Sequence, residues 1–465
     1  MKLIIGPPGT GKTTRLLDIL EEEVKQTDPR RVAFCSFTKK AVIEAVERVK
    51  ARFSFKDSDL PYFRTLHSLG FAMMNFKRSE VMQTSDFTKI GNHLGLKFTS
   101  CYDSADVIAG RNPGDRYRFI EGYAKARCLT PKSVWDGMDA GNLNWFEFLR
   151  YLHTLSEYKQ KFNKVDYADM LEMCSRVLDI DVVIIDEAQD LSTLQWQFIS
   201  RVFANAKRTY IAGDDDQAIY QWSGADVNYF VDLKGDREVL TQSHRVPKAV
   251  HSFAIDITDR IKYRTEKKYN PMDKLGKVDY YMDTSQVDMS EGTWLVLGRN
   301  NHYMNELAKV VRDKGHAFAV KGRPAVNIEH LAAIRLWEKY RKGYEIDKNE
   351  SETIRVFIKE KVWDTGKIWH EAFTNMPWDD KEYYISLLRR GESITKAPRI
   401  NINTIHGVKG SEADHVVLLT DMTMGTWEGQ RLEQDAEHRV WYVGATRCKE
   451  SLHIIMPKGR YHYEI

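Results

Sequence analysis

The sequence opens with a phosphate-binding motif, which constrains the fold more than any other feature. Residues 6–13 read GPPGTGKT and fit G-x-x-x-x-G-K-[ST] at every position. A short apolar run, residues 2–5, precedes the motif, and helical periodicity follows it from residue 12 to about residue 25. In this context, backbone N–H groups and a helix N-terminus can surround phosphate oxygens. The sequence therefore predicts a nucleoside triphosphate site here rather than a chance glycine-rich turn.

An acidic pair ends another predicted strand. The stretch VVIIDEAQD, residues 182–190, places Asp186 and Glu187 directly after an apolar run. An aspartate in this position can hold Mg²⁺ through its water shell. The neighbouring glutamate can orient and deprotonate an attacking water. An Asp-Glu pair by itself is more often a solvated helix start, but the complete phosphate loop favours the functional interpretation.

The order of predicted strands and helices indicates an α/β fold with parallel sheets. Helical insertions are predicted at residues 76–164 and 330–395, so we expect two parallel-sheet units, each interrupted by a mostly helical insertion. Within the first insertion, breaks between helices are expected around 110–115 and 136–144. Strands are predicted at 31–37, 181–185, 208–212, 238–240, 293–297, 317–320, 399–404, 415–419 and 451–456, and helices at 39–53, from 247 and at 302–314.

Composition excludes several classes of protein. Of 465 residues, 42% are hydrophobic and 29% charged, as in a soluble globular protein. The net charge of +3 does not by itself indicate nucleic acid, so any basic groove must be local. No apolar run reaches the roughly 18 residues of a membrane span, and no signal peptide is evident, so we expect a cytoplasmic protein without a membrane partner. Five separated cysteines predict free thiols in a reducing compartment: Cys35, Cys101, Cys128, Cys174 and Cys448.

A run of three aspartates lies beyond the predicted strand at 208–212. GDDDQAIYQW, residues 213–222, continues from Asp214–Asp216 into Gln217 and an aromatic pair, Tyr220 and Trp222. Such a run is typical of a metal site, an acidic face or a turn.

Several ordered motifs resemble superfamily 1 helicases of the UvrD/Rep/PcrA type. They are VIIDEAQDLSTLQWQFI, IAGDDDQAIYQWSGAD, TIHGVKGSEADHVVLL and WYVGATRCKESL. The resemblance covers most of residues 1–75, 165–250, 293–320 and 400–456. It implies two RecA-like domains that clamp ATP in a cleft and hold single-stranded DNA. The predicted parts are 1–75 and 165–236 for the first domain, 237–329 and 396–465 for the second, and insertions at 76–164 and 330–395.

The resemblance implies catalytic roles for matching residues. Lys12 and Glu187 match the phosphate-loop lysine and the catalytic glutamate, and Gln217 matches a sensor of the γ-phosphate. Arg245 and Arg447 match arginines of the second domain, whose planar charged forks suit developing phosphoryl charge. Thr13 and Asp186 match the Mg²⁺ ligands. The implied nucleotide-binding set is Gly6, Pro7, Pro8, Gly9, Thr10, Gly11, Lys12, Thr13, Thr14, His244 and Glu412, the last matching a ribose contact.

The resemblance also implies a DNA-binding set. SFTKKAV and RTLHS match DNA-contacting segments of the first domain, and TIHGVKG contributes a residue of the second. An exposed Trp222 beside a groove would form a stacking platform for bases, whereas most single aromatics or histidines are core residues. Asp214–Asp216 are then expected to shape the turn rather than form a metal site. The implied set is Phe37, Thr38, Lys39, Thr65, His67, Tyr220, Trp222 and His406.

The sequence departs from the family pattern in several places. His244 replaces a tyrosine that stacks on the base, and Ser223 replaces an arginine beside the tryptophan. The second insertion, about 65 residues, is smaller than the domain that UvrD-like enzymes carry there, which predicts a minimal motor. The family's glutamine motif, which reads adenine, has no counterpart before the first strand, so the choice between ATP and other nucleoside triphosphates stays open.

The resemblance predicts a Mg²⁺- and ATP-dependent DNA helicase or translocase moving 3′→5′ on single-stranded and tailed duplex DNA. One alternative is a compact 5′→3′ enzyme of the Dda/RecD type. Another is an ATP-switched subunit that depends on a replication, repair or nuclease partner. RNA is a further candidate track. A P-loop kinase is disfavoured because it gives Gln217, Arg245 and Arg447 no role as a spaced set.

Overall fold

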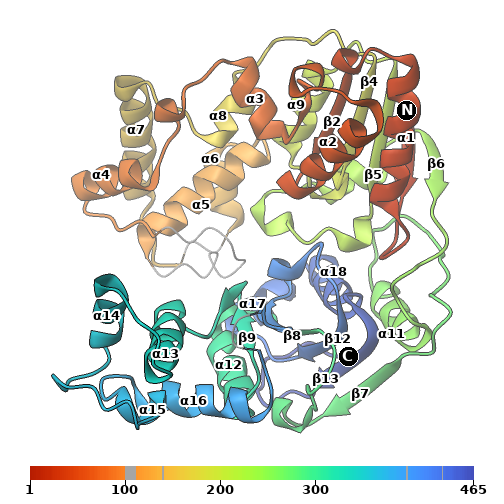
Figure 1. Ribbon diagram of the computed structural model, residues 1–465. Helices are drawn as coiled ribbons and strands as arrows, with labels where there is room; N and C mark the ends of the chain where they lie inside the picture. The colour runs from red at the N-terminus through yellow and green to blue at the C-terminus, as the bar shows by residue number, and fades with distance from the viewer. Residues whose placement is uncertain (100–111, 139–140, 394–395, 432) are drawn as a thin grey trace. The chain divides into compact units, whose positions relative to one another are not determined.

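The computed structural model describes residues 1–99, 112–138, 141–393, 396–431 and 433–465 (Figure 1). Cys101 and part of the breaks predicted at 110–115 and 136–144 lie outside these residues. Contacts divide the chain into two compact units. The first comprises Met1–Gly276 with Gly425–Thr446, and the second Lys277–Met424 with Arg447–Ile465. Each unit is built on a mainly parallel sheet, which confirms the predicted α/β class.

Within the described residues, a six-stranded parallel sheet forms the frame of the first unit. Its order is β3-β2-β4-β5-β1-β6. The carboxyl ends of parallel strands lie along one edge, so the segments that follow β1, β2, β4 and β5 are neighbours there. The strands are β1 (Lys2–Ile5), β2 (Val32–Ser36), β3 (Phe63–Arg64), β4 (Val182–Asp186), β5 (Arg208–Gly213) and β6 (Asp236–Val239).

Helices cover both faces of this sheet, because successive strand residues point to opposite sides. Ile4 and Phe34 pack in one apolar cluster with α1 (Lys12–Gln26) and α2 (Lys39–Phe53). Their neighbours Leu3 and Cys35 pack in another with the remaining core helices. Burial on both faces explains why the central strands are apolar throughout. The helices on the second face are α3 (Leu66–Met73), α8 (Tyr167–Glu172) and α9 (Thr193–Val202), and the unit also contains α10 (Val227–Asp232), α11 (Lys248–Thr258) and α18 (Gln434–Ala445).

The first helical insertion has a hydrophobic core of its own. Tyr117, Phe148 and Tyr151 are each 0% exposed and lie in one cluster whose other members come mainly from the insertion. Figure 1 shows these helices grouped beside α3 and α8 of the same unit. The helices are α4 (Thr84–Leu94), α5 (Pro113–Ala126), α6 (Pro131–Gly137) and α7 (Trp145–Phe162).

A seven-stranded sheet, counted over the residues that the structure describes, forms the second unit. Its order is β10-β9-β11-β8-β12-β13-β7, and the pairing of β10 with β9 is antiparallel while the others are parallel. The strands are β7 (Lys277–Tyr281), β8 (Trp294–Gly298), β9 (Phe318–Val320), β10 (Arg323–Pro324), β11 (Ile400–Thr404), β12 (Ala413–Leu419) and β13 (Cys448–Ile455).

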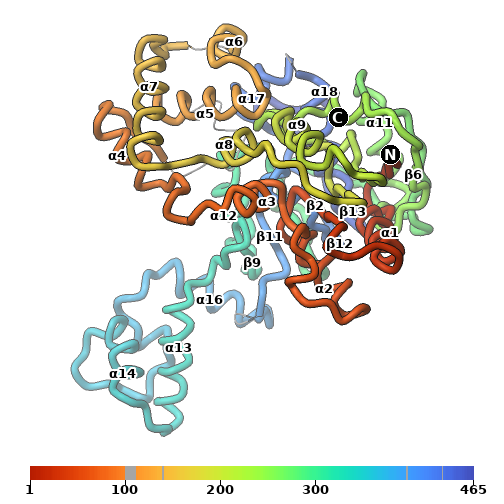
Figure 2. Tube along the Cα trace, turned by 90° about the horizontal axis from the view of Figure 1, so that it is seen from above, coloured from red at the N-terminus to blue at the C-terminus, as the bar shows by residue number. Residues whose placement is uncertain are grey.

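The second helical insertion shares its core with its sheet. Trp337 and Phe373 of the insertion lie in one apolar cluster with Val296 of β8 and Ile402 of β11. Figure 2 shows α13 and α14 to one side of the strands of this unit. The helices of the unit are α12 (Met304–Asp313), α13 (Ile328–Arg341), α14 (Lys348–Arg355), α15 (Trp369–Ala372) and α16 (Trp378–Arg389); α17 (Met424–Gln430) begins at its last residue before the chain returns to the first unit.

The division by contacts differs from the predicted domain parts at two places. Residues 237–276 and 425–446 group with the first unit rather than with the second. The reason is that β6 pairs with β1, and α11 packs against α18. The described cysteines Cys35, Cys128, Cys174 and Cys448 form no disulfide bond, as predicted. None of the described helices combines the length and apolarity needed to cross a membrane.

Phe148→Ala should unfold the first insertion locally, because it empties the centre of a separate core. The expected cost is about 3–5 kcal/mol of unfolding free energy. Hydrogen–deuterium exchange should accelerate in α5 and α7 while β4 stays protected. Phe146→Ala on the same helix is the control: this side chain is 78% exposed, so its loss should change stability by at most about 0.5 kcal/mol. Equal loss of protection in β4 and α5 would contradict an independent core.

Candidate nucleotide-binding and nucleic-acid site

The phosphate loop turns tightly between β1 and α1. Gly6 N donates to Gly213 O at 3.1 Å, which ties the loop to the end of β5. Within the loop, the N and Oγ1 atoms of Thr10 donate to Pro7 O at 3.2 and 2.8 Å. Gly9 and Gly11 have φ of 72° and 80°, a region that side chains rarely adopt. The predicted loop, residues 6–14, thus leads directly into the N-terminus of α1, where anions are favoured.

Lys12 and the acidic pair after β4 meet at this loop. Lys12 Nζ lies 3.3 Å from Glu187 Oε2, and Thr13 Oγ1 donates to Asp186 Oδ2 at 3.3 Å. Burial disfavours the charged ammonium, but the charges of Glu187, Asp186 and Asp214 outweigh it and raise the pKa of Lys12. Burial, and next the charge of Glu187, raise the pKa of Asp186 to about 6. The structure therefore brings all four predicted residues together.

Glu187 has a left-handed backbone conformation, with φ of 53°. This region is uncommon for residues other than glycine and is often strained. Glu187 N donates to Asp186 Oδ1 at 2.8 Å, so the turn also fixes the aspartate. The conformation places two adjacent carboxylates on the same loop, one toward Thr13 and the other toward Lys12.

Gln189 links the two acidic stretches, and no prediction identified it. It is 0% exposed, and its Nε2 donates to Glu187 Oε2 at 2.5 Å. Its Oε1 accepts from Asp214 N at 3.1 Å. Asp214 Oδ2 in turn accepts from Gln217 Nε2 at 2.6 Å. A continuous hydrogen-bond chain therefore joins the predicted general base to the predicted γ-phosphate sensor. In the sequence, the position of Gln189 within DEAQD was the one feature that could have identified it.

The three aspartates after β5 are fully buried and ion-paired. Lys267 Nζ lies within 3.0 Å of a carboxylate oxygen of each one. In the part of the chain that the structure describes, no group of three or more His, Cys, Asp or Glu residues could hold a metal ion. As expected, Asp214–Asp216 shape the turn: Asp214 Oδ1 accepts from Asp216 N at 3.3 Å.

The stretch that carries Arg245 contacts the phosphate loop within the first unit. His244 N donates to Gly9 O at 2.8 Å, and Ser243 Oγ donates to Pro8 O at 2.7 Å. A Cβ added at Gly9 would lie 2.4 Å from Arg245 Cβ, so this glycine permits the approach. The family resemblance predicts these residues in the second domain, whereas by contacts they belong to the same unit as Lys12. Ser243, which is 0% exposed, was not predicted.

Three predicted residues lie in the second unit. Arg447 is 2% exposed and directly precedes β13, and its carbonyl accepts from Ala413 N at 3.1 Å. Glu412 is exposed and forms an ion pair with Lys449 at 2.5 Å. His406 is 6% exposed, in a short helical turn after β11. The structure therefore does not group these three with the residues of the first unit.

Phe37 and Tyr220 form an aromatic pair after β2 and β5. Their ring centroids are 5.3 Å apart with an interplanar angle of 25°, and Phe37 is 37% exposed. Thr38 and Lys39 are exposed at the start of α2, where Thr38 Oγ1 accepts from the backbone N–H of residue 41. Thr65 likewise caps α3 by accepting from the N–H of residue 68 at 3.4 Å. Both threonines thus have a structural role in addition to the predicted DNA contact.

Trp222 is not the exposed platform that was expected. Its side chain is partly buried and packs against the hydrophobic cluster of the first insertion. Ser223, where the family pattern has arginine, is exposed and donates to Tyr220 O at 2.8 Å. Tyr220 is also partly buried, but it stacks on Phe37, whose side chain is exposed. A DNA contact by Trp222 stays a prediction.

A cavity of about 340 Å³ lies where the first insertion meets the sheet domain. Phe37 and His67 line it together with Arg118 and Lys125 of the insertion and Tyr167 of α8. The imidazole of His67 packs edge-on against Tyr167 at 5.6 Å. Burial lowers the pKa of His67 to about 4, although the charge of Asp166 opposes the shift. Burial therefore favours the neutral form of the His67 imidazole.

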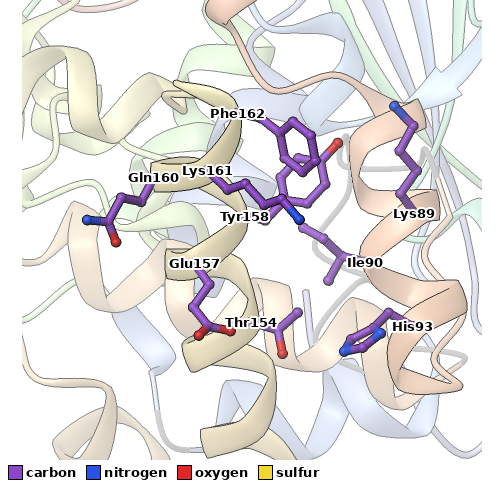
Figure 3. A pocket seen from close by; sticks show the side chains of 9 residues that line it. All are labelled: Lys89, Ile90, His93, Thr154, Glu157, Tyr158, Gln160, Lys161 and Phe162. Atoms are coloured by element: carbon purple, nitrogen blue, oxygen red, sulfur yellow. The ribbon is translucent and has the colours of Figure 1, made fainter.

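A second cavity, about 560 Å³, lies within the first insertion (Figure 3). Figure 3 shows Lys89 and His93 on α4 facing Glu157, Lys161 and Phe162 on α7. No predicted site residue lines this cavity. The cavity beside Phe37 and His67 is therefore the one associated with the candidate nucleic-acid surface.

The lowered pKa of His67 makes stability depend on pH. Between pH 6.5 and about 4 the unfolded chain binds a proton at this residue while the folded chain does not, so stability falls as pH is lowered through this window. His67→Gln should remove the contribution of this residue to the loss of unfolding free energy at lower pH. Urea unfolding at pH 7 and pH 5 measures that loss. His93→Gln is the control, because His93 is exposed on α4. An unchanged difference between the two pH values in His67→Gln would contradict a buried, neutral imidazole.

Two family models of helicase domains match this chain. The family model of the UvrD/REP helicase N-terminal domain matches residues 1–238, and that of the UvrD-like helicase C-terminal domain matches residues 378–459. The first of these alone covers about half of the chain.

Curated relatives match at low identity. The ATP-dependent DNA helicase Rep of Buchnera aphidicola subsp. Baizongia pistaciae is 24% identical over 58% of this chain and 43% of its own length. The helicase PcrA of Bacillus subtilis is 23% identical over 60% and 40%. A probable DNA helicase II homologue of Mycoplasma genitalium is 21% identical over 98% and 82%. The chain thus spans less than half the length of the Rep and PcrA relatives.

Among solved structures, the Arterivirus nonstructural protein 10 helicase aligns with 99% of this chain and 60% of its own, at 11% identity and a TM-score of 0.37. The family relationship depends on the sequence matches, whose residues include the phosphate loop, the acidic pair and the Gln217 stretch. The chain belongs to the UvrD/Rep helicase family.

Proposed function

We propose that this protein hydrolyses ATP to move along single-stranded DNA and to unwind tailed duplex DNA. One observation carries the proposal. The hydrogen-bond chain from Glu187 through Gln189 and Asp214 ends at Gln217, three residues before Tyr220 and its stack with Phe37. A change at the terminal phosphate would therefore reach an aromatic surface suited to bases over a very short length of chain.

The nucleotide site supports hydrolysis through positioned charge. Lys12 would exchange its contact with Glu187 for the terminal phosphates, because both compete for one ammonium. Glu187 would then accept a proton from the attacking water. Gln189 holds this carboxylate by donating to its Oε2, which limits its rotation. Arg245, whose Cβ lies beside Gly9, would extend its guanidinium toward the γ-phosphate.

The residues present fit a bound Mg²⁺. The Thr13 hydroxyl and the Asp186 carboxylate are 3.3 Å apart, and both are hard oxygen ligands of the kind that Mg²⁺ prefers. Burial and the charge of Glu187 raise the pKa of Asp186 to about 6, and a bound cation would favour its ionised form. When bound, Mg²⁺ would neutralise charge on the phosphate oxygens.

The DNA surface supports binding through stacking and phosphate contacts. The Phe37–Tyr220 pair offers a ring face to any base, and exposed Lys39 lies two residues from Phe37. The cavity lined by Phe37 and His67 gives room for an unstacked base. Binding of this kind depends little on sequence and weakens with salt. The names of the Rep and PcrA relatives, which are ATP-dependent DNA helicases, support the same activity.

Polarity and partner dependence follow from one set of assays. The proposed direction is 3′→5′, so duplexes with a 3′ tail should be unwound and those with a 5′ tail should not. Unwinding of the 5′-tailed duplex alone would instead support a Dda/RecD-type motor. ATPase that single-stranded DNA stimulates, without unwinding of either substrate, would support a translocase subunit that needs a replication, repair or nuclease partner. Stronger stimulation by single-stranded RNA would identify RNA as the track.

Lys12→Ala and Glu187→Gln should abolish ATP turnover for different reasons. Loss of the phosphate-binding ammonium should reduce kcat by about 10²-fold or more. Loss of the general base should reduce it by about 10²–10⁴-fold while nucleotide binding persists. Phosphate release assays measure turnover, and filter binding measures retained DNA affinity. Lys25→Ala, exposed on the same helix, is the control. Turnover near the wild-type rate in either active-site variant would refute the assigned site.

Phe37→Ala should weaken binding of single-stranded DNA more than Trp222→Ala. Stacking is worth about 1–3 kcal/mol per base, so the Phe37 change should raise Kd about 5- to 150-fold. Fluorescence anisotropy with a labelled oligonucleotide measures this, and ATPase with and without DNA separates stimulated from basal rates. If Trp222 stacks on DNA, its variant loses stimulated ATPase selectively. An equal loss of both rates would assign Trp222 to the packing of the first insertion.

A further inference from the structure

Three consecutive buried carboxylates surround one lysine that no motif includes. Asp214, Asp215 and Asp216 are each 0% exposed. Lys267 Nζ lies 3.0 Å from Asp214 Oδ1, 2.6 Å from Asp215 Oδ1 and 2.9 Å from Asp216 Oδ2. An ammonium has three N–H donors, so each can serve one aspartate. Burial opposes the charged lysine, but the three carboxylates outweigh it and raise the pKa of Lys267.

Two arginines complete the charge balance of this cluster. Arg264 donates through Nε and Nη2 to both oxygens of Asp216, at 2.9 and 2.5 Å. Arg439 of α18 is 1% exposed; burial lowers its pKa, and the charges of Asp215 and Asp216 oppose this shift. Three cations therefore face three carboxylates, which makes the burial of the whole cluster tolerable.

Asp214 connects this lysine to the nucleotide site. Its Oδ1 faces Lys267, while its Oδ2 accepts from Gln217 Nε2 at 2.6 Å. Its backbone N–H donates to Gln189, which holds Glu187. The orientation of the Gln217 amide thus depends on a carboxylate whose rotation Lys267 restricts.

The segment that carries Lys267 also holds the stretch of Arg245. We call residues 264–275 the anchor segment. Ser243 N donates to Asn270 O at 2.9 Å, and Asn270 N donates to Thr241 O at 2.7 Å. Further along, Met272 N donates to the carbonyl of residue 246 at 2.9 Å. One segment therefore contacts the Gln217 stretch at its start and the Arg245 stretch along the rest of its length.

We propose that Lys267 is a positioning residue that sets Gln217 and Arg245 for the γ-phosphate through the anchor segment. The proposal depends on the ATPase function proposed above and specifies how its site distinguishes ATP from ADP. Gln217 and Arg245 would contact the γ-phosphate, whereas Lys12 and the phosphate loop would also bind ADP. Removing Lys267 should therefore weaken binding of the triphosphate and leave binding of the diphosphate nearly unchanged.

The test compares two nucleotides in the presence of Mg²⁺. Isothermal titration calorimetry measures ADP and the non-hydrolysable imido analogue of ATP with wild type, Lys267→Met and Lys268→Met. For Lys267→Met we expect at least fivefold weaker binding of the analogue, ADP affinity within twofold of wild type, and at least a tenfold loss of kcat. Lys268 is the adjacent exposed lysine, and its variant should match wild type in all three measurements.

Lys267→Arg keeps the test decisive where the methionine variant is unstable. Arginine retains the charge, but its planar fork cannot direct one donor to each of three carboxylates. We expect a folded protein with the same selective loss of analogue binding. Equal weakening of both nucleotides, or wild-type affinity for both, in folded Lys267→Arg would overturn the positioning role. A wild-type protein that binds neither nucleotide would instead contradict the proposed function itself.

Discussion

The positive charge of Lys12 allows carboxylates from two strand ends to be buried together. Asp186, Glu187 and Asp214 all raise its pKa, and burial of such carboxylates without a cation would be costly. This arrangement requires β1, β4 and β5 to be parallel neighbours, because only then do their following loops meet at one edge. The phosphate loop, the acidic pair and the Gln217 stretch are therefore positioned by a single feature of the sheet.

A second group of buried charged residues lies next to the candidate nucleotide site. The site around Lys12 and the cluster around Lys267 share Asp214, which takes part in both. Gln189 and Gln217 connect to the same aspartate by neutral amide hydrogen bonds. Because most of the polar groups in this network are buried, a displacement at one member leaves another unsatisfied. This makes the network stiff, which suits a site that must respond to one phosphate group.

The two insertions show that helical periodicity predicts secondary structure but not the packing of the helices. Both were predicted as helical, and the structure confirms this for the described residues. Periodicity could not tell that Phe148 belongs to a separate core while Trp337 joins the core of its sheet. It also could not predict that Trp222 packs against the first insertion, because that contact joins segments that are distant in the chain.

The sequence by itself determined the α/β class, the phosphate loop and the identity of the residues around it. These features depend on local spacing, in which a motif and its flanking strand and helix are adjacent in the chain. Only the tertiary structure revealed Gln189, Ser243 and Lys267 as partners, and only it grouped Arg245 with Lys12 in one unit. Their contacts bring together residues distant in sequence, and a lysine or serine without a motif carries no signal until a buried carboxylate or carbonyl is placed beside it.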